Sequence, residues 1–135
     1  MYLVDSNTFS ELVQPVAIQK VIDNYLANQS KIYLAVTVWQ EMCFGYHRMP
    51  DGKRKDKIHA FLYEQILALP MLMYDKTCAD IHAKMRADCE KKGKTLSYSD
   101  SQIASIALAH GLTVVTRNVR DFQAIDGLHI VNWFD

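Results

Sequence analysis

Residues 100–122 read DSQIASIALAHGLTVVTRNVRDF, and the order of apolar and polar residues predicts a helix, a strand and a carboxylate beyond it. Ser99 is expected to cap the helix and Gly111 to end it, as serine and glycine do at helix termini. LTVVT at 112–116 is the clearest strand of the chain, because β-branched residues dominate it. Asp121 follows the strand. This stretch therefore predicts a buried strand with an acid just past its carboxyl end.

The rest of the chain repeats this alternation of short apolar runs and longer helical stretches. Further strands are expected at Tyr2–Val4, 32–37, 71–74 and Leu128–Val131, and further helices at 16–27, 39–45, 55–69 and 76–91. Thr37 is expected to cap the second of these helices, with Gln40 completing a capping box. Such alternation predicts one domain over residues 1–135, an α/β protein built as a three-layer α/β/α sandwich with a mainly parallel central sheet.

Composition limits the classes of function. The 135 residues are 50% hydrophobic, with 15 basic and 15 acidic side chains, so bulk charge alone does not hold nucleic acid. The segment GKRKDK at 52–57 is a candidate for a local basic patch. We see no membrane-length apolar run and no signal peptide, and three scattered cysteines are expected to be reduced in the cytoplasm. The five histidines lack metal-ligand spacing and are expected at the surface or at helix ends.

Four acids fall where predicted strands end or helices begin. They are Asp5, Glu41, Asp100 and Asp121. Function in open parallel sheets lies just beyond the carboxyl ends of the strands, so the four carboxylates are expected at one edge. Unit charges about 5 Å apart repel by roughly 3 kcal/mol at an effective dielectric near 20, and a hard divalent cation removes that conflict. All-oxygen ligation suits Mg²⁺ or Mn²⁺, which assist phosphodiester hydrolysis.

Neutral groups lie beside these acids. Asn7, Ser6 and Thr116 could orient the carboxylates or a bound water. Each acid also has a plainer interpretation as a turn residue or helix cap, and the helix dipole alone favours Asp100 at a helix start. The residues by themselves leave both interpretations open.

Several motifs resemble a PIN-domain ribonuclease of the VapC toxin type. They are YLVDSN at 2–7, VWQEMCFG at 38–45 followed by MPDGKRK at 49–55, YSDSQIASIALAHGLTVVTRNVRDF at 98–122 and HIVNW at 129–133. The resemblance implies that Asp5, Glu41 and Asp100 are metal-binding acids. It places the fourth in the segment that holds Asn118 and Asp121, where we favour Asp121. Ser6 stands where the family commonly has threonine.

The resemblance further implies a metal-dependent endoribonuclease. A water bound to Mg²⁺ or Mn²⁺ would attack the RNA phosphorus, and a VapB-type antitoxin would neutralise the enzyme by presenting a basic side chain to the acids. It also implies a homodimer and a hetero-oligomer with the antitoxin, without membrane contact. Candidate RNA contacts are Arg117, Arg120, Lys53 and Arg54.

Three other classes are weighed against this hypothesis. A haloacid-dehalogenase-like phosphatase needs a second aspartate two residues after Asp5, where Asn7 stands. A response-regulator receiver needs adjacent acids and a late lysine after a strand, where this chain has Arg117. A PIN fold that binds RNA or a partner without cutting is the third, although all four acid positions are filled.

Overall fold

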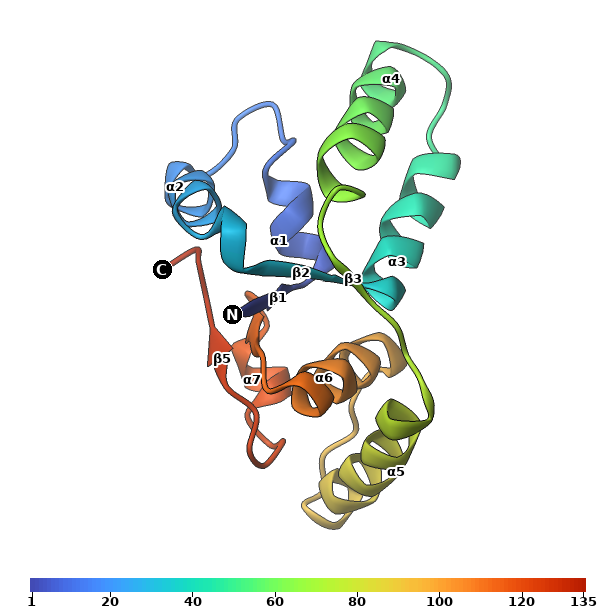
Figure 1. Ribbon diagram of the computed structural model, residues 1–135, viewed down its shortest axis with the longest axis vertical. Helices are drawn as coiled ribbons and strands as arrows, with labels where there is room; N and C mark the ends of the chain where they lie inside the picture. Colours follow the sequence, from blue (N-terminus) through green and yellow to red (C-terminus); the bar gives the residue numbers. More distant parts are fainter.

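A sheet of five strands lies at the centre of the computed structural model, which describes residues 1–135 (Figure 1). The strands are β1 (Tyr2–Val4), β2 (Ile32–Ala35), β3 (Met71–Leu72), β4 (Thr113–Val115) and β5 (Ile130–Val131). Their spatial order is β3-β2-β1-β4-β5, and every neighbouring pair is parallel. The predicted α/β class with a parallel sheet is confirmed.

Helices cover both faces of the sheet. They are α1 (Ser6–Glu11), α2 (Gln19–Ala27), η1 (Gln29–Lys31), α3 (Val36–His47), α4 (Lys53–Ala60), η2 (Phe61–Ile66), α5 (Lys76–Lys91), α6 (Tyr98–His110) and α7 (Val119–Phe122). Figure 1 shows α1 to α4 on one side of the strands and α5 to α7 on the other, which makes the three predicted layers. None of these helices combines the length and the apolar character needed to cross a bilayer.

Both faces of the central strands are buried. Leu3, Val4, Leu34, Val114 and Val115 are all fully shielded from solvent. A strand covered by helices on both sides needs continuous apolar residues rather than alternation, which explains the runs seen in the sequence. These strands anchor one core of 25 buried residues, and Asp5 directly follows β1 at its carboxyl end.

A six-residue helix, α1, was not predicted. It starts directly after β1, and the Asp5 carboxylate caps it by accepting a 2.8 Å hydrogen bond from the backbone N–H of Thr8. Six residues are too few to show helical periodicity, so the sequence pattern gives no signal for it. The run of Ser6 and Asn7 after the acid is therefore the first turn of a helix and not a turn between strands.

Two predicted helix caps are wrong. Helix α3 follows β2 without a loop, its N-cap Ala35 makes no side-chain bond, and the buried Thr37 hydroxyl has no hydrogen-bond partner. Helix α6 begins two residues early, because the Ser97 hydroxyl rather than Ser99 accepts the N–H of Asp100 at 3.1 Å. Gly111 ends α6 as predicted, with φ of 66°.

Other boundaries move by a few residues. The strand expected at 71–74 pairs only over Met71–Leu72, and the helix expected from residue 16 starts at Gln19. The helix expected over 55–69 starts at Lys53 and widens into π-helical geometry at η2, where Leu67 N–H donates to Leu62 five residues earlier, at 2.9 Å.

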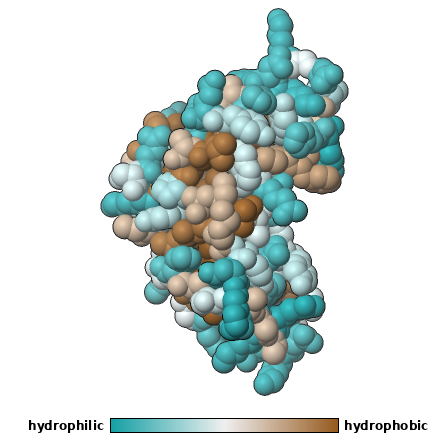
Figure 2. Space-filling model, turned by 45° about the vertical axis from the view of Figure 1, so that its right-hand side comes forward, coloured by the Kyte–Doolittle hydropathy of each residue, from teal (hydrophilic) through white to brown (hydrophobic).

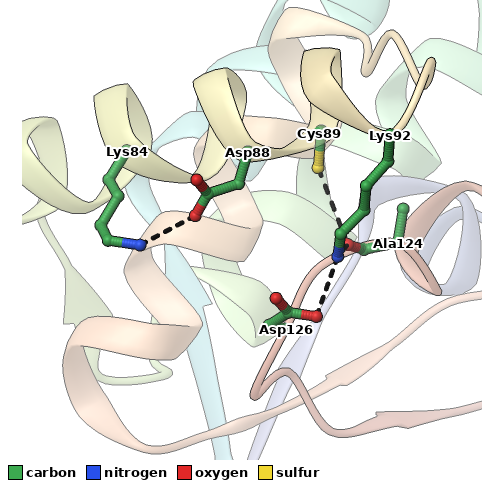
Figure 3. A network of polar contacts seen from close by, with 6 residues as sticks. All are labelled: Lys84, Asp88, Cys89, Lys92, Ala124 and Asp126. Carbon is green, nitrogen blue, oxygen red and sulfur yellow. Dashed lines mark hydrogen bonds and ion pairs between the residues drawn. The ribbon is translucent and has the colours of Figure 1, made fainter.

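Lys92, just past the end of α5, fixes the segment that follows α7. Its ammonium group donates to the Ala124 carbonyl at 2.8 Å and pairs with Asp126 at 2.9 Å, while the Cys89 thiol lies 3.9 Å from the same carbonyl (Figure 3). These contacts bridge more than 30 residues of sequence. They hold in place the segment just beyond Asp121, which lies on α7.

Two glycines provide a test of the helix boundaries. Gly111→Ala should destabilise the protein by about 1 kcal/mol, because a Cβ is unfavourable at positive φ. Gly45→Ala, inside α3, should stabilise it by about 0.5–1 kcal/mol, since glycine costs backbone entropy within a helix. A Cβ at either position meets no atom within 4 Å, so sterics do not confuse the comparison. Urea unfolding measures both, and equal signs would contradict the assigned conformations.

Candidate active site

The sheet reverses its direction of winding beside β1. The chain runs from β1 outward to β2 and β3, then returns to β4 on the opposite side and continues to β5. In such sheets the crevice at the reversal, outside the carboxyl ends of the strands, is where ligands bind. Asp5 lies at this point, because its backbone N–H donates to the carbonyl of Val115 at the end of β4, at 3.0 Å.

Asp5 caps a helix of the fold and also lies at the crevice. It is buried, with 8% of its surface exposed, and its Oδ1 is held by the N–H of Thr8. The N-terminus of a helix favours a negative charge through its unpaired N–H groups and its dipole. The cap therefore keeps the side chain in one orientation at the edge of the sheet.

Glu41 is anchored by the helix on the other side of the crevice. It lies in the second turn of α3, and the Ser6 hydroxyl at the start of α1 donates to its Oε2 at 2.9 Å. This bond joins segments 35 residues apart. Ser6 was predicted to orient a carboxylate, and the structure shows which one.

Asp100 lies in the first turn of α6 and completes a cluster. Burial raises the pKa of its half-buried carboxyl, and the negative charges of Asp121, Asp5 and Glu41 raise that pKa further. A cavity of about 90 Å³ is shared by three of these acids. It is lined by Asp5, Ser6, Asn7, Val38, Glu41, Ser99, Asp100 and Ile103. Carboxylates from three separate elements thus converge on one small space.

Asp121 lies at the border of this cluster rather than in the cavity wall. It is exposed on α7, yet its charge acts on Asp100 more strongly than that of Asp5 or Glu41. Thr116 is fully buried, and its hydroxyl accepts the N–H of Asn118 at 3.0 Å. Thr116 therefore shapes the turn before α7.

The four basic candidates separate into two kinds. The Arg117 guanidinium stacks over the Phe134 ring at 4.5 Å, and that of Arg54 donates to the carbonyl of Val13. These two side chains have structural partners. Lys53 and Arg120 are exposed, at the start of α4 and on α7 beside Asp121.

The donor set fits a hydrated magnesium-like ion. No three Asp, Glu, His or Cys side chains are arranged to ligate one ion directly. Mg²⁺ commonly keeps several waters and takes only one or two carboxylates from the protein. Carboxylate oxygens, the Asn7 amide and hydroxyl groups are the hard donors it prefers. An ion would also relieve the repulsion that raises the pKa of Asp100.

A larger groove opens from the same crevice and was not foreseen from the sequence. It measures about 310 Å³, lies between α1, α3 and α4, and shares Ser6, Asn7 and Glu41 with the acid cavity. Its apolar wall is formed by Val13, Met42, Tyr46, Met49, Ile58, Phe61 and Leu62. The groove depends on how distant helices meet, and no local pattern encodes that.

The fold and the crevice define a doubly wound α/β protein with an acidic site where its winding reverses. The chain belongs to the PIN domain family, whose sequence profile matches residues 2–128. It is 31% identical to toxin FitB of Neisseria gonorrhoeae, with both chains covered completely, and 32% identical to the VapC ribonuclease Y4jK of Sinorhizobium fredii, covering 98% of this chain and 96% of the relative.

Solved structures agree with this assignment. The FitAcB structure from Neisseria gonorrhoeae superposes with a TM-score of 0.90 at 31% identity, over 99% of both chains. A DNA-bound VapBC structure from Salmonella typhimurium superposes with a TM-score of 0.85 at 26% identity, over 98% of this chain and 97% of that one. Membership of this family rules out the phosphatase and receiver hypotheses.

Neutralising Asp100 should stabilise the metal-free protein. A carboxyl whose pKa is raised by folding binds its proton more tightly in the folded state. Stability therefore falls as pH rises through the range between the ordinary and the raised pKa, and stays lowered at neutral pH. Asp100→Asn removes this cost, so the melting temperature at pH 7 should rise by a few degrees.

The gain from Asp100→Asn should vanish below about pH 4, where the carboxyl is protonated in both states. Asp80→Asn is the matched control, because Asp80 forms an exposed pair with Lys76 away from the cluster. It should change stability by less than about 0.5 kcal/mol. A fall of several degrees for Asp100→Asn at pH 7 in EDTA would contradict crowding of the acids.

Proposed function

We propose that this chain is a Mg²⁺- or Mn²⁺-dependent endoribonuclease and the toxin of a toxin–antitoxin pair. The observation that carries the proposal is the cavity into which three separate elements bring Asp5, Glu41 and Asp100. The family supports the reaction, because relatives that match nearly the whole chain are named VapC ribonuclease and tRNA(fMet)-specific endonuclease VapC.

In this proposal the four acids surround a hydrated ion, one or two of them binding it directly and the others through its waters, with Asp121 at the border of the site. When bound, a divalent ion lowers the pKa of water and stabilises charge on a phosphoryl oxygen. The protein fixes the positions of the side chains that would bind the ion. Thr8 N–H orients Asp5, Ser6 orients Glu41, and the Ser97 cap holds the backbone of Asp100. Asn7 and Thr116 support the site, as an amide on the cavity wall and as the residue that shapes the turn before α7.

Exposed cations beside the acids are proposed to guide the RNA backbone. Arg120 lies next to Asp121, and Lys53 begins α4 at the end of the groove that includes Arg54. Phosphate contacts of this kind position a nucleic acid without reading its sequence. Arg117 and Arg54 can contribute charge while their side chains keep their protein contacts.

The apolar groove is proposed to hold a segment of a VapB-type antitoxin. Structures of FitAB and of VapBC, each bound to DNA, are among those this chain resembles. An apolar peptide in the groove would end beside Glu41, which lines both spaces. A basic side chain from that peptide would pair with the carboxylates and compete with the metal.

The protein is also proposed to form a homodimer and to be located in the cytoplasm. Phe44, Met73 and Tyr98 are each more than half exposed, and Figure 2 shows apolar side chains gathered across the middle of one face of the molecule. Exposed apolar surface of this kind is typical of interfaces. The three cysteines are unpaired, which suits a reducing compartment.

Asp5→Asn tests the reaction without breaking the helix cap, since an asparagine oxygen can still accept the Thr8 N–H. Cleavage of RNA in Mg²⁺ should slow at least about 100-fold, because even the loss of an outer-shell partner costs 10–100-fold. The purified variant and Asp80→Asn should both keep the parent's circular dichroism. Cleavage by Asp5→Asn at the parent's rate would rule out the proposed role of Asp5. A parent inactive on RNA with both Mg²⁺ and Mn²⁺ would leave a PIN fold that binds without cutting.

A further inference from the structure

A continuous chain of hydrogen bonds joins α5 to the first turn of α6. The Tyr74 hydroxyl lies 2.7 Å from His82 Nδ1, and His82 Nε2 lies 2.8 Å from the Ser101 hydroxyl. Ser101 in turn donates to the carbonyl of Tyr98 at 2.9 Å. His82 and Ser101 are only 5% and 1% exposed, so the expectation that His82 lies at the surface is wrong.

The protons in this chain can be assigned by starting from the Ser101 hydroxyl. Its single proton goes to the Tyr98 carbonyl, so Ser101 can only accept from His82, and Nε2 must carry a hydrogen. Burial lowers the pKa of His82, with a further contribution from Arg86, and this favours the neutral ring. In the neutral ring Nδ1 is then an acceptor, and the Tyr74 hydroxyl donates to it.

These bonds end on the residues that flank Asp100. Ser101 follows Asp100 directly, its N–H donates to the Ser97 carbonyl at 3.0 Å, and its carbonyl accepts from Ser105 at 2.6 Å. The His82 ring also lies edge-on to the Tyr98 ring, with centroids 5.4 Å apart. The turn that carries Asp100 is therefore fixed by Ser97 at its start and by His82 at its end.

We propose that His82 is a positioning residue, which orients the first turn of α6 so that Asp100 faces Asp5 and Glu41 across the cavity. The inference rests on the proposed function, because in that function Asp100 helps to bind a metal ion. The rest of the contact between α5 and the core is made by apolar side chains such as Cys78, Met85 and Cys89. Packing alone would favour another apolar residue at position 82, because a buried polar group costs stability unless it is paired.

Two near-isosteric substitutions test the two ends of the hydrogen-bond chain one at a time. His82→Gln places an amide nitrogen near the site of Nε2 and keeps a donor for Ser101. His82→Asn places its amide near the site of Nδ1, keeps a partner for Tyr74 and leaves Ser101 without a donor. Mn²⁺ binding by calorimetry and amide hydrogen exchange at Asp100 and Ser101 are measured for both, on the full chain.

His82→Asn should weaken Mn²⁺ binding about tenfold, the scale of an outer-shell partner, and speed exchange at both amides. His82→Gln should stay close to the parent in both measurements. Met85→Ala is the packing control. It removes a buried side chain of α5, so it should lower the melting temperature while leaving the Mn²⁺ affinity unchanged.

Equal Mn²⁺ affinity in His82→Asn and the parent would overturn the proposal, as would equal weakening in the asparagine and glutamine variants. Weakening by Met85→Ala to the same extent would also overturn it, because general loosening would then explain the effect. If the two His82 variants differ as expected but the parent does not cleave RNA, the positioning role of His82 stands and the nuclease proposal fails.

Discussion

Repulsion among carboxylates at the carboxyl end of β1 is the constraint on which the rest of the structure depends. Each close pair costs on the order of 1–4 kcal/mol, depending on how much water screens it, and a domain of this size has about 5–15 kcal/mol of stability in total. Burial is the first cause of the raised pKa of Asp100; a hydrogen bond with Ser97 opposes it, and the charges of Asp121, Asp5 and Glu41 add to it. The divalent ion of the proposed function would offset this cost.

The fold tolerates the cluster by giving each acid its own local support. Asp5 caps α1, and Asp100 lies in the first turn of α6, so two helix N-termini face the negative charge. Ser6 donates to Glu41, and Lys92 holds the segment beyond Asp121. Structural and catalytic interpretations of these acids are therefore not alternatives. The cap on α1 fixes the orientation of the Asp5 carboxylate, as its proposed role of metal ligand requires.

The sequence predicted the parallel sheet and its acidic edge because both follow from local patterns. Apolar runs mark strands buried on both faces, and an acid after such a run falls at the edge of the sheet by topology. Capping was predicted less well, since Ser97 and Ser99 offer the same chemistry and only the geometry of α6 decides between them. The groove and the burial of His82 arise where distant helices meet, so no local sequence pattern predicts either of them.

The most direct test of the account is a crystal of the protein soaked in Mn²⁺, with data collected for anomalous scattering. The account predicts a manganese peak in the cavity between Asp5, Glu41 and Asp100, with water completing its coordination. Full occupancy of Mn²⁺ at another place, with this cavity empty and the three carboxylates turned apart, would contradict it.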